Sequence, residues 1–303
     1  MLLSFRKEGC VKNNYSIWVA EFANVPNYPL SGLIYGAHNQ GIVRLPYCYV
    51  VIKGRGHIAM VDVGYNHKEY GAVLATMYGA RDWHPPREVL TECGITPEDV
   101  THAFLTHAHF DHMGNIEDFP NATFYIQERE LSKWVWAMSL ERRFRWLMAG
   151  VDPADIMRTV DLARNGRLVC VDGDRADVLP GIDIHAAHDT HTWGSMYVRL
   201  RNDLSPNSKN AWIFAGDLVY MQENLRGYKP EDPEIIPIGF ASGSQVKLVM
   251  TTDELIKGVD GDTSRVVAIH EDRLKDMFPS RLAANGVRVT ELALADDEAS
   301  RVC

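Results

Sequence analysis

The sequence predicts an α+β fold in which two β-sheets are flanked by helices. Apolar, β-branched runs at residues 47–53 and 57–64 are separated only by a short glycine-containing segment, which is a hairpin signal. Segments of helical composition, such as residues 128–150, stand between groups of strands and do not alternate with single strands. The chain has no internal repeat, low-complexity stretch or break in composition, so we expect a single domain over residues 1–303.

The elements are expected in the following order. Residues 15–40 are rich in Asn, Pro, Gly and Tyr without a clear period, and indicate a loop. A helix is expected within residues 67–93, interrupted by the His-Pro-Pro at 84–86, and two more at 128–150 and 244–258. Strands are expected at residues 47–53, 57–64, 101–107, 122–127, 167–171, 182–187, 196–201, 211–217 and 264–270.

Composition excludes several classes of protein. A chain with 46% hydrophobic and 23% charged residues has an ordinary globular composition. The net charge of −9 is a poor match for nucleic acid or an anionic membrane, so we expect neither as a partner. Five scattered cysteines without a CxxC pair indicate no disulfide framework and no zinc ribbon. The first residues are too short in apolar length for a signal peptide and no run could span a membrane, so a cytoplasmic location is expected.

The stretch THAHFDHMGN, residues 106–115, places four potential metal ligands directly after a predicted buried strand. Residues two apart on an extended segment point the same way, so His107 and His109 can converge on one ion. Asp111 and His112 lie where the chain turns, and can serve a neighbouring ion. The alternative is a histidine-rich surface turn that binds nothing, but the position at a strand end favours a metal site.

Two ions need more ligands than this stretch supplies, and three later places offer them. His188 and His191, then Asp217, and finally His270 each follow an apolar run. Any one of these could be an ordinary residue at the edge of the core, and their joint placement at strand ends carries the argument. Imidazole and carboxylate together suit zinc, which we expect, and also Fe, Mn or Co. A pair of ions roughly 3.5–4 Å apart is a common hydrolytic arrangement.

These motifs together resemble the metallo-β-lactamase superfamily, over about residues 45 to 281. The segment MVDVG at 60–64 resembles the early strand and Asp-x-Gly loop of the family. The segment THTWGS at 190–195 resembles its Gly-His-Thr-Pro-Gly-Ser turn, with Thr190 and Trp193 as departures. The resemblance implies a four-layer αββα sandwich with the metal site at one edge of the two sheets.

The resemblance also implies how the ligands are divided. The first ion would be held by His107, His109 and His191, which excludes His188 as a ligand. The second ion would be held by Asp111, His112 and His270. Asp217 would bridge both ions, and a hydroxide between them would be the nucleophile. Asp62 matches an early aspartate of the family that orients the histidine loop and is not a ligand.

Within the superfamily, the residues are most similar to the N-acyl homoserine lactonases and their relatives. Tyr220 lies three residues after Asp217, a spacing found in that branch, and HAHFDHMGN resembles its HxHFDHxGGN with one glycine fewer. The β-lactamases themselves have a cysteine where Asp217 falls and lack His112. The departures are the missing glycine and the Ile269 that stands before His270 in place of glycine.

The resemblance implies a metal-dependent hydrolase that opens a lactone, either an N-acyl homoserine lactone or another small cyclic ester. Tyr220 would donate a hydrogen bond to the developing oxyanion, and Asp111 would carry a proton to the leaving alkoxide. The nearest alternative is hydrolysis of a thioester, cyclic amide, aryl ester or phosphodiester. A metal-binding sensor without turnover is a further alternative, which the oxyanion donor disfavours. The expected partner is a small-molecule substrate, and the chain could form a homodimer.

Two features have no assigned role at this stage. The aromatic-rich segment 128–150 could form an apolar wall for a substrate, but core packing or a dimer face explains it equally well. Within it, Arg142, Arg143 and Arg145 could meet a substrate carboxylate, although a solvated face is the simpler interpretation. His188 is expected to be a histidine at a strand end that contacts its neighbours.

Overall fold

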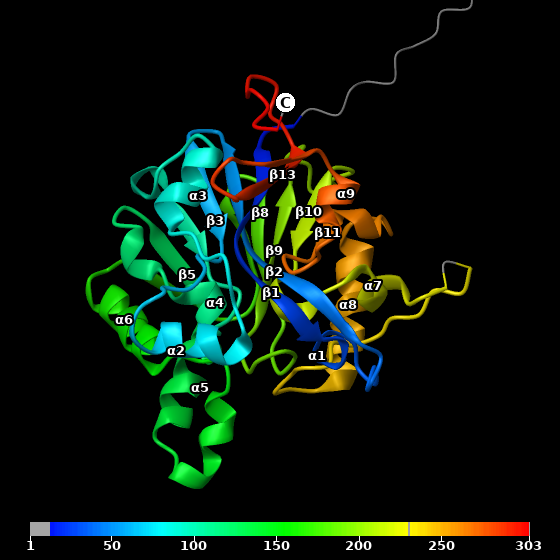
Figure 1. Cartoon of the computed structure of the whole chain (residues 1–303). Coiled ribbons are helices and arrows are strands. Elements are labelled where there is room, and N and C mark those ends of the chain that lie inside the picture. Colours follow the sequence, from blue (N-terminus) through cyan, green and yellow to red (C-terminus); the bar gives the residue numbers. More distant parts are fainter. Residues whose placement is uncertain (1–12, 230, 303) are drawn as a thin grey trace, which may run out of the picture.

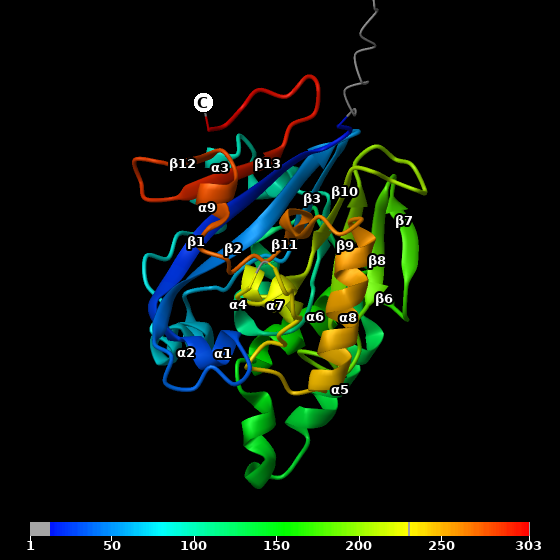
Figure 2. The ribbon, with the colours of Figure 1, turned by 90° about the vertical axis from the view of Figure 1, so that its right-hand side faces the viewer.

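The computed structural model describes residues 13–229 and 231–302, and its strands form two sheets that face each other (Figures 1 and 2). The larger sheet has the order β12-β13-β1-β2-β3-β4-β5-β6 and the smaller has the order β11-β10-β9-β8-β7. The strands of the larger sheet are β1 (Ser16–Pro29), β2 (Ile42–Gly54), β3 (His57–Val61), β4 (His102–Phe104), β5 (Thr123–Gln127), β6 (Leu168–Val171), β12 (Ser280–Leu282) and β13 (Arg288–Ala293). Those of the smaller sheet are β7 (Arg175–Leu179), β8 (Ile182–Ala186), β9 (Met196–Arg201), β10 (Ala211–Phe214) and β11 (Val266–Val267).

Helices cover the outer faces of both sheets, as the sandwich requires (Figure 1). Helices α3, α5 and α6 pack on the larger sheet, and α8 packs on the smaller. The helices are α1 (Leu30–Leu33), α2 (Glu69–Tyr78), α3 (Pro86–Glu92), α4 (Phe110–Met113), α5 (Glu128–Met138), α6 (Pro153–Arg164), α7 (Gln222–Arg226), α8 (Gln245–Gly258) and α9 (Leu274–Met277). The expected αββα arrangement is therefore confirmed.

Strand β2 shows why the sequence folds into layers. Its residues alternate between two apolar clusters, and both of its faces are buried. Tyr49 and Val51 belong to the cluster that also contains Leu90 of α3, on the outer side of the sheet. Val50 and Ile52 belong to the cluster between the sheets. Burial of both faces excludes an exposed polar side and fixes this strand in the middle of the molecule.

Several predicted elements are confirmed. Strands β2 and β3 form the expected antiparallel hairpin, and β9 pairs antiparallel with β10. Strands β3, β4, β5 and β6 pair in parallel, so this part of the larger sheet is parallel while the rest is antiparallel. Parallel neighbours have their carboxyl ends at the same edge of the sheet, which gathers the loops after β3 and β4 there.

Other predictions were wrong. Residues 15–40 are not a loop, because Ser16–Pro29 is a long strand that pairs with both β2 and β13. The helix expected over 128–150 ends at Met138 and is followed by a 3-10 helix, Arg142–Met148. Among the described residues, no helix has the length and apolar character needed to cross a membrane.

Candidate metal centre

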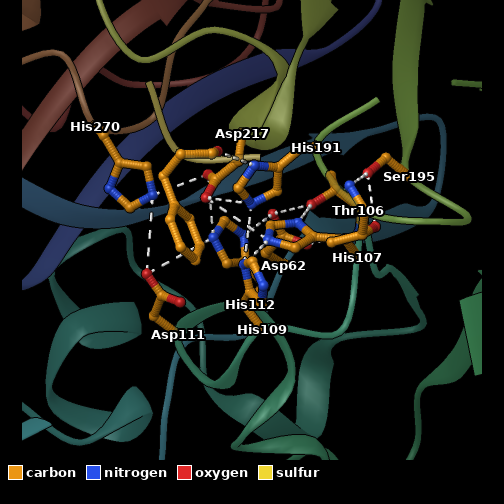
Figure 3. Close-up of polar contacts among 12 residues, drawn as sticks. Asp62, Thr106, His107, His109, Asp111, His112, His191, Ser195, Asp217 and His270 are labelled. Atoms are coloured by element: carbon orange, nitrogen blue, oxygen red, sulfur yellow. Dashed lines mark hydrogen bonds and ion pairs between the residues drawn. The ribbon is translucent and has the colours of Figure 1, made fainter. Parts of the chain in front are cut away.

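The candidate metal centre lies between the carboxyl ends of strands from both sheets (Figure 3). The loop after β4 carries the residues of the HxHxDH motif, and short α4 begins inside this motif. The smaller sheet contributes the β8–β9 loop and the segments after β10 and β11. All seven residues expected to be ligands are brought together and buried: His107, His109, Asp111, His112, His191, Asp217 and His270.

Four of the seven form a first group with converging donor atoms. The Nδ1 atom of His109 lies 3.0 Å from Nε2 of His107 and 2.9 Å from Nε2 of His191. Oδ2 of Asp217 lies 3.6 Å from Nε2 of His107 and 3.3 Å from Nε2 of His191. Donors that surround one zinc ion at about 2.0–2.2 Å lie roughly 3.3–3.6 Å apart, so this group could hold a single cation.

A second group stands on the other side of the same carboxylate. Oδ1 of Asp217 lies 3.2 Å from Nε2 of His112 and 3.0 Å from Nε2 of His270. Oδ2 of Asp111 lies 3.7 Å and 3.9 Å from these two nitrogens. Because the two oxygens of Asp217 face different groups, its carboxylate has the position of a bridge between two cations.

The far side of the His112 ring is held by Asp62. Oδ2 of Asp62 lies 2.8 Å from Nδ1 of His112 and accepts a hydrogen bond from the Thr106 hydroxyl. Its Oδ1 accepts a second hydrogen bond from the backbone N–H of Thr106. Asp62 is fully buried and contributes no atom to either donor group, so it orients the histidine loop as expected.

Backbone carbonyls fix two further rings. Nδ1 of His270 lies 2.7 Å from the carbonyl oxygen of Pro46, and Nδ1 of His191 lies 2.9 Å from that of Phe240. Each contact occupies one ring nitrogen as a donor and leaves the other as an acceptor that faces the donor cluster.

The donor cluster contains buried polar atoms that lack hydrogen-bond partners. Among the described residues, these include Nε2 of His112, Nε2 of His270 and Oδ1 of Asp217. All three side chains are at most 4% exposed. Buried polar atoms without partners are rare and call for an explanation, and three such atoms that converge at 3.0–3.2 Å fit a cation. The residues therefore fit the two divalent ions that the sequence implied.

The environment favours the protonation state that binds metal in the first group. Burial lowers the pKa of His107 and His109 well below the ordinary value, and that of His191 to about 4. Neutral imidazole is the form that coordinates a cation. In the second group burial opposes the charge on His112, but the carboxylates of Asp217, Asp111 and Asp62 raise its pKa well above the ordinary value.

Tyr220 lies within the site, beside Asp217. Its hydroxyl donates a hydrogen bond of 2.6 Å to Oδ2 of Asp217. Burial, followed by the nearby charge of Asp217, raises the pKa of Tyr220 well above its ordinary value, so the hydroxyl keeps its proton. Burial also raises the pKa of Asp111, whose carboxyl group lines a small pocket together with Tyr220.

Glu130, a buried residue that the sequence analysis missed, joins the two histidine loops. Its carboxylate is fully buried and accepts four hydrogen bonds. Oε1 accepts from the backbone N–H of Ala108 and the indole of Trp134, and Oε2 accepts from the Thr192 hydroxyl and the backbone N–H of Gly194. No spacing rule in the sequence marks this residue, because three of its four partners lie 22 to 64 positions away.

A small pocket of about 60 Å³ opens onto the donors. Tyr28, Tyr47, Tyr78 and Tyr220 line it together with Asp111 and other residues of the cluster. Tyr28 was also missed, because it lies near the end of β1, in the segment that was expected to be a loop.

The remaining predicted features fall outside the donor cluster. Nε2 of His188 lies 3.1 Å from Oε1 of Gln127, so His188 contacts a neighbour and belongs to neither donor group. Trp193 packs on Trp134, with ring centroids 4.6 Å apart, where the family turn has proline. Trp134 is fully buried, whereas Trp146 is 68% exposed, so the aromatic-rich segment is divided between core and surface.

Solved structures with the same fold include several hydrolases. The structure of an N-acyl homoserine lactone hydrolase with the product N-hexanoyl-L-homoserine at its catalytic metal centre matches with a TM-score of 0.63 and 16% identity, over 88% of this chain and 96% of that one. AidC, a dizinc quorum-quenching lactonase, matches with a TM-score of 0.61 and 16% identity, over 94% and 97%. The hydrolase AbOPH matches with a TM-score of 0.62 and 18% identity, over 96% and 100%. At these identities the likeness concerns the fold.

Two curated relatives from mycobacteria match a short segment, and the family model matches most of the chain. This chain is 39% identical over 57 residues to the probable metallo-hydrolase Rv2300c of Mycobacterium tuberculosis, and to Mb2322c of Mycobacterium bovis. That segment is 19% of this chain and 18% of each relative's length. The model of the metallo-beta-lactamase superfamily matches residues 41–270. With its αββα sandwich and buried His/Asp cluster, this chain belongs to the metallo-beta-lactamase superfamily.

Proposed function

We propose that this protein is a dinuclear metal hydrolase that opens the ring of a small lactone, with N-acyl homoserine lactones as the first class to examine. The observation that carries the proposal is the position of the Asp217 carboxylate, with one oxygen toward each group of donors. His107, His109 and His191 would hold one ion, and the second would be held by the remaining donors: Asp111, His112 and His270. Zinc is the proposed metal.

Two divalent ions would supply Lewis acidity and would lower the pKa of bound water to near 7. The chain's own residues supply the remaining chemistry. As the carbonyl carbon of the lactone gains an oxygen, its carbonyl oxygen becomes an oxyanion, to which the protonated Tyr220 hydroxyl donates. The ring C–O bond then breaks, and Asp111 carries the proton of the newly added oxygen to the leaving alkoxide, so that the products are a carboxylate and an alcohol.

A cyclic ester is supported by three further points. The Tyr220 hydroxyl is buried and donates a hydrogen bond to Asp217. At this position it can donate to an oxyanion, whereas a metal-binding sensor needs no such donor. The pocket at the donors is about 60 Å³, enough for a reacting carbonyl group and little more. Several structural neighbours with this fold are described as N-acyl homoserine lactonases.

The test is a substrate panel with zinc-loaded protein. Ring opening of a lactone releases acid, so a pH indicator should report turnover of N-acyl homoserine lactones or simple γ-lactones. Thioesters, cyclic amides, aryl esters and phosphodiesters form the comparison set. A higher kcat/KM for one of these than for every lactone would replace the proposed substrate class, and no turnover of any compound would remove the enzymatic proposal.

A His109→Ala variant serves as the control for the site. We expect it to lose both activity and bound metal, because Nδ1 of His109 lies closest to the other donors of the first group. Full activity with unchanged metal content would refute the site assignment. We further propose a small-molecule substrate without a nucleic-acid or membrane partner, and a cytoplasmic location, which the unpaired Cys48, Cys93 and Cys170 support.

A further inference from the structure

A cavity of about 850 Å³ lies beside the candidate metal centre and is not used in the reaction described above. It is bounded by α2, the end of α5, the 3-10 helix Arg142–Met148 and the residues that precede α6. Its volume is in the range of small-molecule binding sites. Much of the lining is apolar: Leu74, Met77, Met138, Leu140, Met148 and Val151.

The cavity adjoins the pocket that contains the donors. Tyr78 and Gly150 line both spaces. The backbone of Gly150 is tied to the histidine loop, since its carbonyl oxygen accepts a hydrogen bond of 2.8 Å from the N–H of Phe110. Because the pocket at the donors measures only about 60 Å³, the body of any larger substrate must extend beyond it, and the adjoining cavity offers the space.

The structure separates the three arginines, for which the sequence left open a substrate carboxylate or, as the simpler interpretation, a solvated face. Arg142 and Arg145 line the cavity, and Arg143 does not. Arg143 is engaged elsewhere, with an ion pair of 3.2 Å to Glu141 and its guanidinium 4.9 Å from the centre of the Phe144 ring. Within residues 13–229 and 231–302, neither Arg142 nor Arg145 has an ion-pair partner.

The acids that line the cavity do not cancel this charge. Glu141 is paired with Arg143, on a solvent-exposed part of the chain. Asp152 is 1% exposed and uses Oδ1 to accept a hydrogen bond from the N–H of Ala154 at the start of α6. Asp152 has no ion-pair partner among the described residues, and its Oδ2 accepts no hydrogen bond. The lining therefore carries two unpaired guanidinium groups against one unpaired carboxylate, which leaves it positively charged, and neither arginine lines the pocket at the donors.

We infer that this cavity binds the body of the substrate, and that the substrate is an ester or lactone whose apolar chain or ring system ends in a carboxylate held by Arg142 and Arg145. The inference rests on the proposed hydrolytic function and adds the substrate class. Guanidinium groups bind carboxylates through charge-assisted, often bidentate hydrogen bonds, and the apolar lining supplies the hydrophobic part of the affinity. The two arginines lie away from the donors, so they would contact the end of the substrate opposite the reacting carbonyl.

Binding can be tested without turnover. Decane-1-sulfonate and 1-decanol share one alkyl chain, and sulfonate is a weak metal ligand. By titration calorimetry on the zinc-loaded protein, below the micellar range, we expect the sulfonate to bind about tenfold more tightly than the alcohol, the gain of one charge-assisted contact. Arg142→Gln/Arg145→Gln should remove most of this difference, whereas Arg143→Gln should retain it. Equal affinities, or an equal loss in both variants, would overturn the inference.

Kinetics provide the second arm. A γ-lactone with a long alkyl chain that ends in a carboxylate is compared with the primary amide of the same chain. The wild-type protein should favour the carboxylate through a lower KM, and the double variant should lose that preference while it retains turnover of the amide. If the wild-type enzyme turned over both compounds with equal KM values for the carboxylate and the amide, the inference would be contradicted and the hydrolytic function would stand. Absence of turnover would contradict the proposed function, and the calorimetry would still decide the carboxylate site.

Discussion

Glu130 holds the two loops that carry the first group of donors. Its substitution by glutamine replaces two acceptor positions with an amide N–H₂ that would face existing N–H or O–H donors. We expect Glu130→Gln to weaken metal binding by about 10-fold to 100-fold, the range found for residues that orient ligands. The measurement is competition for zinc with a chromogenic chelator.

A matched control separates this effect from a general loss of stability. Glu291 is also buried, and its carboxylate accepts from the Trp18 indole, the Ser300 hydroxyl and the backbone N–H of Arg301. Glu291→Gln should lower the melting temperature without a change in zinc affinity. If both variants lost the same affinity, the loss would come from unfolding, and Glu130 would have no special part in the positions of the ligands.

Tyr220→Phe removes the hydroxyl that donates a hydrogen bond to Asp217, and so tests its role as an oxyanion donor. The ring packs within the buried site and should remain, so metal content should be unchanged. We expect kcat for lactone opening to fall by about 100-fold to 1000-fold, the effect of removing one oxyanion donor. An unchanged kcat would mean that Tyr220 is a packing residue.

The sequence could place the seven candidate donors together because they follow apolar runs whose strand ends meet at a common edge. The choice of His191 over His188 came from the resemblance to the family. It could not predict Glu130, because its partners in the two histidine loops meet it only after α5 packs against these loops. Tyr28 was missed for a different reason. It lies in a segment that was expected to be a loop, and no sequence pattern distinguishes a tyrosine that lines a pocket from any other tyrosine in a loop.

At the level of elements, the start of α5 and the turn before β9 approach so closely that only glycine fits between them. A Cβ atom on Gly194 would lie 2.2 Å from the backbone nitrogen of Glu130, which is a backbone contact and cannot be relieved by rotation of a side chain. We therefore expect Gly194→Ala to lower the free energy of unfolding by about 1–3 kcal/mol, as overpacking does, and to weaken zinc binding as well.

Urea denaturation and zinc competition check this expectation. Gly166→Ala is a suitable control for zinc affinity. Nothing lies within 4 Å of a Cβ atom at Gly166, and its positive φ of 70° means that alanine lowers stability there through the backbone alone. Equal zinc affinity in the two variants would show that the contact between α5 and the turn does not position His191.

Strand β1 is an element that the sequence pattern could not predict. Ser16–Pro29 contains Asn and Pro residues that resemble a loop, and its burial is nearly continuous over the first ten positions. A strand paired on both sides and buried on both faces has no alternation to detect. Its pairing with β13, about 270 residues later, depends on the tertiary fold and leaves no local signal. The hairpin β2–β3, by contrast, has a short turn and was predicted.

At the scale of the whole molecule, the metal donors connect the two sheets. His107 and His112 follow β4 of the larger sheet, whereas Asp217 and His270 follow strands of the smaller. A ligand that binds only the native state adds about 2.7 kcal/mol to the free energy of unfolding when its free concentration is 100 times Kd. Removal of the metal should therefore lower the melting temperature by roughly 4 °C for a chain of this size.

Calorimetry with and without a chelator measures this shift. The His109→Ala variant should show little further decrease when the chelator is added, because it has already lost its metal. An unchanged melting temperature in chelated wild-type protein would mean that the cluster does not bind metal in the folded state.

The central claim is that one carboxylate, Asp217, lies between two cations. Anomalous diffraction at the zinc edge from crystals of the zinc-loaded protein tests it most directly. The account predicts two anomalous peaks, one beside His107, His109 and His191 and the other beside the second group, Asp111, His112 and His270, with an oxygen of Asp217 toward each peak. A single peak, or two peaks that Asp217 does not join, would contradict it.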